Sequence, residues 1–394
     1  MKIMHVINNL RGGGAQNLVV SLARYHAGLG QSVAITIVDR PTTEYERATI
    51  DQLDADGVSV SSLGYIPRDR RPRWLQLASY LEAEFEKRQP DLVHSHLEMS
   101  HAVTALARRR ATVKPLHVTT IHNAPEIWGM TLCKRIAMRA LFWNVLNRST
   151  PRIYCSKAAR LCEASWDGQW RVIPNGVVPG VAPAGLEAKR AAFRQQFGIP
   201  ADALVVITVG TVREEKNHAT AVRAIAAAGQ KLWRPVHYVI CGQEGSGTPA
   251  LFEAVKDTGI SKRVHLLGLR KDVREILHYA DCYLSASLRE GLPLAILEAM
   301  FTGLPCVLSN IQPHCDVVSG VAGCFLAEPA PVGLADALAA AALSQDRPQQ
   351  LRALREPQLA SHTISHCADL YMQFYQDLLE KKGNSKHERK PISP

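Results

Sequence analysis

Leu204-Val205-Val206-Ile207-Thr208-Val209 is a short apolar run, and Gly210-Thr211-Val212-Arg213-Glu214-Glu215-Lys216-Asn217-His218 follows it directly. A run of this kind is typical of a strand that is buried on both faces. The polar segment places Arg213 and Lys216 at the carboxyl end of that strand, where open α/β sheets bind ligands. The stretch therefore predicts a βα unit with two cations at a ligand-binding edge.

Similar apolar runs alternate with helical patterns along the rest of the chain. Strands at this spacing indicate βα units and parallel sheets. They fall into two sets, separated by the proline- and glycine-rich stretch that begins at Ile173-Pro174-Asn175-Gly176. With 394 residues the chain has room for two cores. The sequence therefore predicts an α/β fold with two Rossmann-like, doubly wound parallel-sheet domains that face a cleft.

The domain boundaries follow from these patterns. We expect an N-terminal domain at residues 1–178, a C-terminal domain at 179–364, a C-terminal helix at 365–380 and a basic flexible tail at 381–394. The nine cysteines are odd in number and form no Cys-x-x-Cys pair, which favours a reducing compartment. No apolar run reaches about 18 residues. These features predict a cytoplasmic protein that is neither exported nor membrane-spanning.

Positive charge is concentrated in the first half and the tail. The net charge is +8 over residues 1–180, −2 over 181–380 and +4 over 381–394. This distribution favours an anionic partner such as an acidic lipid surface, a phosphorylated substrate or nucleic acid. Arg68-Asp69-Arg70-Arg71-Pro72-Arg73-Trp74 and Arg108-Arg109-Arg110 could attract the inner face of a membrane. Solubility alone explains the charge equally well.

The strongest single pattern is Arg289-Glu290-Gly291-Leu292-Pro293-Leu294-Ala295-Ile296-Leu297-Glu298-Ala299-Met300. Pro293 suits the first turn of a helix and Gly303 suits its end, so we expect Glu290 in the preceding loop and Glu298 inside the helix. Carboxylates accept hydrogen bonds from vicinal hydroxyls, and a helix N-terminus can face a diphosphate. In isolation, two glutamates at this spacing are more often solvated acids.

Two glycine-containing turns strengthen the ligand-binding hypothesis. Gly12-Gly13-Gly14-Ala15-Gln16 follows the first predicted strand and precedes a helical pattern. It does not fit the dinucleotide pattern G-x-G-x-x-G, and a plain tight turn is the alternative. Cys241-Gly242-Gln243-Glu244-Gly245 ends another strand with small residues that a ligand could approach closely. Glu214 and Glu215 could instead pair with the nearby cations at the surface.

Histidines stand at the ends of two strands in the first half. His122 follows Thr119-Thr120-Ile121, and its position where a strand meets the predicted cleft favours a functional role. We expect His94 and His96 to point to opposite faces of their strand, so that they cannot bind a metal together. Of the two, His96 is expected to lie nearer the cleft.

Taken together, these segments resemble glycosyltransferase family 4, the retaining GT-B enzymes that include bacterial polysaccharide and lipopolysaccharide transferases. The segments that carry the resemblance are Gly12-Gly13-Gly14-Ala15-Gln16, Asp91-Leu92-Val93-His94-Ser95-His96, Ile121-His122-Asn123, Ile173-Pro174-Asn175-Gly176-Val177, Val209–Asn217 and Glu290–Met300. The resemblance implies a nucleotide-sugar donor such as a UDP- or GDP-sugar, bound by the C-terminal domain. It also implies a saccharide or lipid-linked acceptor on the N-terminal side.

By this resemblance, Glu298 would hold the ribose hydroxyls, Glu290 would touch the transferred sugar, and Arg213 with Lys216 would hold the diphosphate. His122 would orient the sugar or the acceptor. The expected donor-binding residues are Gly13, Gly14, Thr211, Gly242, Gly291, Leu292, Pro293 and Glu298. We expect no metal and no cofactor, because cations and helix N-termini can stabilise the leaving diphosphate.

One departure from the family pattern concerns the phosphate site, because Thr211 stands where most members have an arginine, and Arg213 follows two residues later. Another is Ile311-Gln312-Pro313-His314-Cys315-Asp316, where Asp316 could replace an acid of the family. Two other functions stay open: a nucleotide-sugar epimerase of the same architecture, and a basic nucleic-acid-binding protein. The second lacks a recognisable docking motif.

Overall fold

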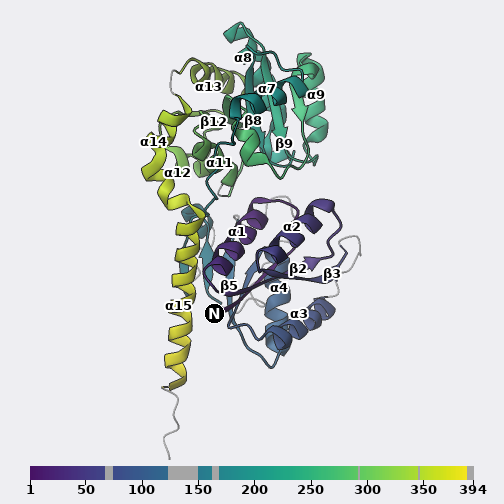
Figure 1. The fold of residues 1–394 in the computed structure, drawn as a ribbon, viewed down its shortest axis with the longest axis vertical. Helices are drawn as coiled ribbons and strands as arrows, with labels where there is room; N and C mark the ends of the chain where they lie inside the picture. Colours follow the sequence, from purple (N-terminus) through teal and green to yellow (C-terminus); the bar gives the residue numbers. More distant parts are fainter. Residues whose placement is uncertain (67–73, 123–149, 162–167, 292, 345–346, 388–394) are drawn as a thin grey trace, which may run out of the picture. The chain divides into compact units, whose positions relative to one another are not determined.

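The computed structural model describes residues 1–66, 74–122, 150–161, 168–291, 293–344 and 347–387. It divides the chain into two compact units (Figure 1). Unit 1 contains Met1–Gly176 and the segment that starts at Ile364, and unit 2 contains Val177–Thr363. The division lies within two residues of the boundaries expected from the sequence, but the C-terminal segment forms part of unit 1.

Unit 1 is built on a parallel sheet that has seven strands in the described residues, in the order β3-β2-β1-β4-β5-β6-β7. The strands are β1 (Lys2–Ile7), β2 (Ser32–Asp39), β3 (Ser59–Tyr65), β4 (Leu92–His96), β5 (Leu116–Ile121), β6 (Arg152–Tyr154) and β7 (Trp170–Val172). The helices are α1 (Gly14–Gly28), α2 (Glu44–Ala55), α3 (Trp74–Arg88), α4 (Glu98–Arg110), α6 (Lys157–Leu161) and α15 (Ile364–His387).

Unit 2 is built on a second parallel sheet, with six strands in the order β10-β9-β8-β11-β12-β13 among the described residues. The strands are β8 (Leu204–Val209), β9 (Val236–Cys241), β10 (Val264–Leu266), β11 (Cys282–Ser285), β12 (Cys306–Ser309) and β13 (Cys324–Ala327). The helices are α7 (Leu186–Gln196), α8 (His218–Leu232), α9 (Thr248–Thr258), α10 (Val273–Leu277), α11 (Leu294–Thr302), α12 (Gln312–Val318), α13 (Pro331–Leu343) and α14 (Pro348–Leu359), with short 3-10 turns η1 (Glu214–Lys216), η2 (Ser261–Arg263) and η3 (Ala360–His362).

The strand order reverses in the same way in both sheets. In each sheet the first two crossovers lead away from the first strand on one side, and the third places the next strand on its other side. The reversal therefore lies between β1 and β4 in unit 1 and between β8 and β11 in unit 2. Doubly wound sheets bind ligands outside the carboxyl ends of their strands at such a reversal. The prediction of two Rossmann-like parallel-sheet domains is therefore confirmed, and the fold itself marks one candidate site in each unit.

The opening strand of unit 2 shows how the sequence specifies this burial. Val205 and Ile207 of β8 belong to one apolar cluster, and Leu204 and Val206 belong to another. Successive side chains of a strand point to opposite faces, so a continuous apolar run buries both faces of the sheet. Helices cover both faces accordingly (Figure 1).

The C-terminal helix α15 packs on unit 1 through buried polar contacts. His26 Nε2 lies 3.1 Å from the Ala368 carbonyl oxygen, and the Tyr371 hydroxyl lies 3.4 Å from Thr120 Oγ1. The helix continues to His387, so the tail predicted for 381–394 begins inside the helix. This part of the prediction was wrong because tertiary packing of the preceding turns extends a helix beyond its apolar pattern. Among the described residues, no helix has both the length and the apolar character that crossing a bilayer requires.

Candidate functional site

The carboxyl edge of the unit 2 sheet holds an ion pair between two of the predicted site residues. Lys216 Nζ lies 2.6 Å from Glu290 Oε1, and Ser287 Oγ donates a hydrogen bond to the same oxygen at 2.7 Å. Lys216 comes from the loop after β8, whereas Ser287 and Glu290 come from the loop after β11. The pair therefore spans the reversal of the strand order, where the fold predicts a ligand site.

Glycines bring the loop that follows β8 close to the loop that follows β9. A Cβ atom at Gly242 would lie 1.8 Å from the carbonyl oxygen of Gly210 and 3.0 Å from the backbone nitrogen of Thr211. The Val212 N–H donates to the Gln243 carbonyl at 2.9 Å. Gly242 is therefore needed for contact between two loops, which gives it a structural reason beyond the ligand approach expected from the sequence.

A polar network supports Glu290 from the next strand along the sheet. Ser309 Oγ, at the end of β12, donates to the Ser287 carbonyl oxygen, and Ser309 Oγ also lies 3.2 Å from His314 Nδ1. The His314 ring is fully buried, and no partner for its Nε2 is found among the described residues. Ser287, Ser309 and His314 were missed by the site prediction; the departure from the family pattern at 311–316 was the one available signal for His314.

Glu298 lies inside α11, and Pro293 precedes the first residue of that helix, as the sequence predicted. Desolvation in this partly enclosed position raises the pKa of the Glu298 carboxyl to about 7, although the positive charge of Arg274 opposes the shift. Glu290 and Glu298 both raise the pKa of the buried Tyr283 hydroxyl, after desolvation. Gly291 lies in the loop before α11, and Leu292 lies outside the described residues.

Arg213 is not brought to the ion pair of Lys216 and Glu290. Its side chain is 58% exposed and lies 3.6 Å from Glu215 Oε1. The alternative that Glu214 or Glu215 pairs with a nearby cation therefore holds for Arg213, which pairs with Glu215. Lys216 pairs with Glu290 instead. Of the predicted site residues, Lys216 and Glu290 are therefore the two that an ion pair joins.

The glycine-rich turn of unit 1 begins α1 directly, with Gly13 as the residue before its first turn and Gly14 as its first residue. Side chains brace the turn. Asn9 Oδ1 accepts a hydrogen bond from the Arg11 N–H at 3.2 Å, and Asn9 Nδ2 donates to Asp39 Oδ2 at 3.1 Å. The first turn of α1 contains no acidic residue, so its N-terminus is electrostatically open to an anion.

His122, directly after β5, belongs to a buried histidine cluster that also includes His5 of β1 and His94 and His96 of β4. The rings of His94 and His96 lie 4.1 Å apart, and His96 Nδ1 lies 3.1 Å from His122 Nε2. The expectation that His94 and His96 point to opposite faces was wrong, because residues two apart on a strand share a face. His96 is the member that contacts His122.

Three of these residues have donor atoms close enough to suggest a metal site. Ring nitrogens of His5, His94 and His96 lie within 4.8 Å of one another, and this is the one such group found in the described residues. However, both nitrogens of His94 already have hydrogen-bond partners, Tyr375 at 2.5 Å and Thr120 at 2.7 Å. We therefore interpret the cluster as a polar network.

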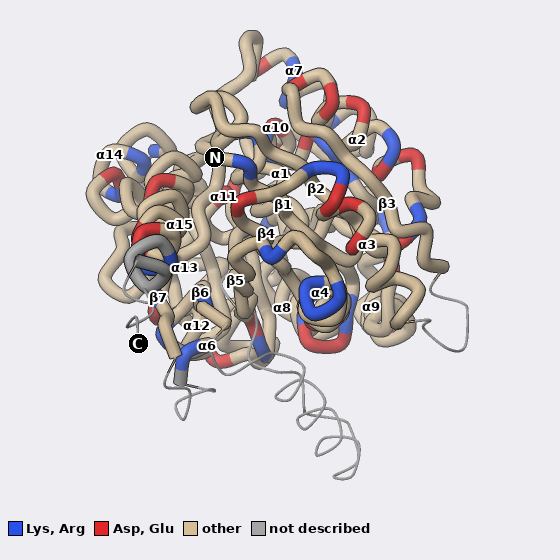
Figure 2. The backbone as a smooth tube through the Cα atoms, turned by 90° about the horizontal axis from the view of Figure 1, so that it is seen from below, with Lys and Arg blue, Asp and Glu red and all other residues tan. Residues whose placement is uncertain are grey.

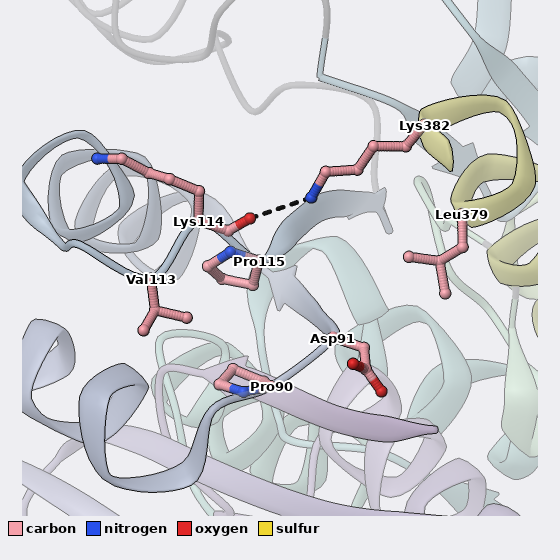
Figure 3. A pocket seen from close by; sticks show the side chains of 7 residues that line it. All are labelled: Pro90, Asp91, Val113, Lys114, Pro115, Leu379 and Lys382. Carbon is pink, nitrogen blue, oxygen red and sulfur yellow. Dashed lines mark hydrogen bonds between the residues drawn. The ribbon is translucent and has the colours of Figure 1, made fainter. Parts of the chain in front are cut away.

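A separate hollow of about 330 Å³ lies in unit 1 at the opposite end of the sheet (Figure 3). Asp91 and Pro115, which precede β4 and β5, line it together with Leu379 of α15. Lys382 Nζ donates to the Lys114 carbonyl oxygen across it at 3.1 Å. Because it adjoins the amino ends of the strands, it is not the ligand site that the fold predicts.

The basic segments noted in the sequence fall into different parts of the chain. Residues 67–73, which hold the arginines of the first segment, lie outside the described residues. Arg108-Arg109-Arg110 forms the last turn of α4, where Lys and Arg positions gather in Figure 2. Within that turn, Arg108 Nε donates to the Pro115 carbonyl at 2.8 Å and Arg110 Nε lies 3.1 Å from Glu82. The positive charge of this turn is therefore partly compensated.

Comparison with protein families gives one match in each half of the chain. Residues 12–180 match the model described as Glycosyltransferase Family 4. Residues 189–354 match the model described as Glycosyl transferases group 1. The two matches are successive and together span both units.

Individual relatives agree with these matches. The chain is 30% identical over 259 residues to UDP-Gal:alpha-D-GlcNAc-diphosphoundecaprenol alpha-1,3-galactosyltransferase of Escherichia coli, covering 62% of this chain and 64% of the relative. It is 25% identical over 338 residues to GDP-mannose:cellobiosyl-diphosphopolyprenol alpha-mannosyltransferase of Xanthomonas oryzae, covering 81% of each chain.

Solved structures share the fold. HepE of Anabaena, in complex with UDP-glucose, superposes with a TM-score of 0.79 at 18% identity, covering 96% of this chain and all of that one. Sucrose-phosphate synthase of Thermosynechococcus elongatus gives a TM-score of 0.76 at 19% identity, covering 97% and 100%. The fold and the sequence matches define a glycosyltransferase of the GT-B class. The chain belongs to glycosyltransferase family 4.

Proposed function

We propose that this glycosyltransferase moves a hexose from a nucleotide diphosphate sugar to a saccharide or lipid-linked acceptor, with retention of anomeric configuration, during synthesis of a cell-surface polysaccharide. The observation that carries the proposal is the ion pair of Lys216 and Glu290 at the edge of the unit 2 sheet. The relatives support the substrate class, because two of their names specify a UDP-sugar or GDP-mannose donor and a lipid diphosphate acceptor.

In the proposed mechanism, the donor diphosphate competes with Glu290 for the ammonium group of Lys216. The two groups are 2.6 Å apart without a ligand, and an ammonium group can stabilise the charge of a departing diphosphate. Glu290 is then free to accept a hydrogen bond from a hydroxyl of the transferred sugar, while Ser287 keeps it in place. Arg213 turns from the surface to the diphosphate as a second cation.

The remaining predicted residues bind the rest of the donor. Glu298 accepts hydrogen bonds from the two ribose hydroxyls, and His122 orients the sugar or the acceptor. Backbone groups near the sheet edges contact the phosphates and the sugar, at Gly13, Gly14, Thr211, Gly242, Gly291, Leu292 and Pro293. The reaction then needs no metal, since cations and helix N-termini neutralise the leaving group.

A two-part assay tests this function. A thermal-shift panel of UDP-, GDP- and ADP-sugars identifies the donor, because a ligand of the folded state raises the melting temperature. Incubation of that donor with and without saccharide acceptors, followed by NMR of the product anomeric proton, tests transfer and retention. An epimerase would instead release the nucleotide and an altered monosaccharide at the same rate with and without an acceptor. That result would contradict the proposal.

We further propose a cytoplasmic location with peripheral binding to the anionic inner face of a membrane. The excess positive charge of residues 1–180 and the arginines at the end of α4 support this, at about 1 kcal/mol per cation near such a surface. Co-sedimentation with phosphatidylglycerol vesicles should decrease as salt is added. Equal recovery with neutral and anionic vesicles would contradict the proposal.

A further inference from the structure

Three buried histidines of unit 1 form a continuous hydrogen-bonded chain. His5 Nδ1 lies 3.1 Å from His96 Nε2, and His96 Nδ1 lies 3.1 Å from His122 Nε2. His5 and His96 are completely buried, and His122 is 8% exposed. The hydrogen-bonded row of rings ends at two nitrogens, His5 Nε2 and His122 Nδ1. No partner for either nitrogen is found among the described residues.

All three rings are neutral at physiological pH. Burial lowers the pKa of His5 to about 3 and the pKa of His122 to about 4. The pKa of His96 is lowered well below its ordinary value by burial and by the neighbouring histidines. Each neutral imidazole carries one proton, on either Nδ1 or Nε2. The chain of three rings therefore contains three ring protons.

Proton counting leaves two arrangements. Two of the three protons occupy the two hydrogen bonds, and the third must sit at one end of the chain. If it sits on His5 Nε2, then His122 carries its proton on Nε2 and offers a lone pair at Nδ1. If it sits on His122 Nδ1, then His5 and His96 also carry their protons on Nδ1. The three tautomers change together, because each hydrogen bond has one donor and one acceptor.

The surroundings distinguish the two ends. Both end nitrogens are buried and lack a partner among the described residues, and buried N–H groups without a partner are rarer than buried acceptors without one. His5 lies within β1 and is completely buried. His122 instead follows β5 at the carboxyl edge of the sheet, where a bound ligand can supply an acceptor. The tilted ring of His94 packs against His96 with ring centroids 4.1 Å apart, and both His94 nitrogens are engaged elsewhere, so the middle ring is held in place.

We propose that His5 and His96 are positioning residues that hold His122 in its Nδ1–H tautomer, so that His122 donates a hydrogen bond to an oxygen of the substrate. In this state His122 has no free lone pair at its outer end and does not act as a general base. The inference rests on the proposed function, since it assigns the direction of the hydrogen bond at one of its site residues.

The first test observes the tautomers without any substrate. The full chain is labelled with ¹⁵N-histidine, and two-bond ¹H–¹⁵N correlation spectra report which ring nitrogen carries the proton; His122→Gln and His96→Gln assign the signals. We expect Nδ1–H at both His96 and His122. Nε2–H at His122 would overturn the inference, whether or not the chain transfers sugar, so its failure is distinct from failure of the proposed function.

The second test compares two neutral replacements of His96. Its Asn variant keeps a polar group near the position of Nδ1, which faces His122, whereas its Gln variant keeps one near Nε2, which faces His5. We expect H96N to retain most of the kcat with the donor identified above and H96Q to lose about tenfold, because an imidazole in the wrong tautomer loses its function. Melting temperatures show that both are folded. Equal kcat values in the two variants would overturn the inference.

Discussion

The two sheets have the same strand order, but the side chains at their carboxyl edges differ in charge. In unit 2 the edge is charged: Lys216 pairs with Glu290, and their side chains are 26% and 11% exposed. In unit 1 neutral groups lie next to the reversal: His5, His96 and His122 are buried and joined by hydrogen bonds, apart from the ion pairs that Arg11 forms with Asp39 and Glu46. The comparison shows that the topology of a doubly wound sheet determines where a site can form, while the residues in the loops and at the strand ends determine which groups it can bind.

The difference follows from burial. An ion pair at a partly exposed edge keeps some of its hydration, and a charged ligand can exchange with either partner. A fully buried imidazole loses the hydration of its charged form, so it stays neutral. The charged edge suits a diphosphate, and the neutral histidines of unit 1 suit uncharged hydroxyl groups. Each of the following predictions tests one side of this contrast.

Acid should have the largest effect, and it acts on the neutral histidines. The pKa of His117, in β5, is lowered by burial to about 3, while an unfolded histidine has a pKa of about 6.5. Below about pH 6.5 the unfolded state binds more protons than the folded state, so the free energy of unfolding decreases as pH falls. Each such histidine contributes about 1.4 kcal/mol per pH unit. Denaturant titrations between about pH 7.5 and pH 5 measure this slope.

A pair of variants tests the assignment of that slope. His117→Gln removes one histidine that stays neutral in the fold, so the pH dependence should become shallower by about 1.4 kcal/mol per pH unit. His366→Gln, at an exposed position on α15, should leave the slope of the parent chain. A slope that is equal in the two variants would contradict the assignment of this pH dependence to buried, neutral histidines of unit 1.

Removal of the cation from the charged edge should have the next largest effect. Lys216→Ala deletes the group that is proposed to stabilise the leaving diphosphate, so kcat/KM should fall about 100-fold or more. Lys231→Ala is the matched control, because Lys231 pairs with Asp336 at an exposed surface of the same unit. It should change stability by less than about 1 kcal/mol and leave turnover intact. Similar kcat/KM values in both variants would remove Lys216 from the site.

Gly242→Ala should disturb the charged edge through the backbone. The new Cβ would lie 1.8 Å from the Gly210 carbonyl oxygen, so the two loops must separate at a cost of about 1–3 kcal/mol. We expect a lower melting temperature and a higher donor KM. Gly28→Ala, with no neighbour within 4 Å of the added atom, should keep both. An unchanged melting temperature for Gly242→Ala would show that the loops do not depend on this contact.

Much of the fold could be predicted from the sequence because it depends on local patterns. The run Leu204–Val209 predicted a strand buried on both faces, and the structure divides its side chains between two cores. Pro293 and Gly303 predicted the limits of α11, which runs from Leu294 to Thr302. Local patterns also placed Lys216 at the end of a strand and Glu290 in the loop before a helix, but the contact between them depends on the order of β8 and β11 in the sheet.

The parts that failed depend on contacts between distant segments. The Tyr375 hydroxyl reaches His94 from 281 residues away, and no spacing in the sequence indicates this pair. Ser309 and Ser287 join neighbouring loops through a side chain and a carbonyl oxygen, and serines at strand ends are too common to be noticed. The faces of His94 and His96 could have been predicted, since period-two alternation alone places them together.

The smallest predicted effect concerns Glu298, which lies inside α11. Its pKa is raised to about 7 by desolvation, so a fall in pH through 7 protonates it. The protonated carboxyl is a weaker acceptor for the ribose hydroxyls that Glu298 is proposed to bind. The dissociation constant of the nucleotide should therefore rise as pH decreases. Glu298→Gln cannot titrate and should bind about tenfold more weakly at alkaline pH, with no pH dependence from this position. Calorimetric titration of UDP or GDP, whichever stabilises the chain, measures both. If Glu298→Gln kept the parent pH profile, another group would control nucleotide binding, and Glu298 would be a structural acid of α11.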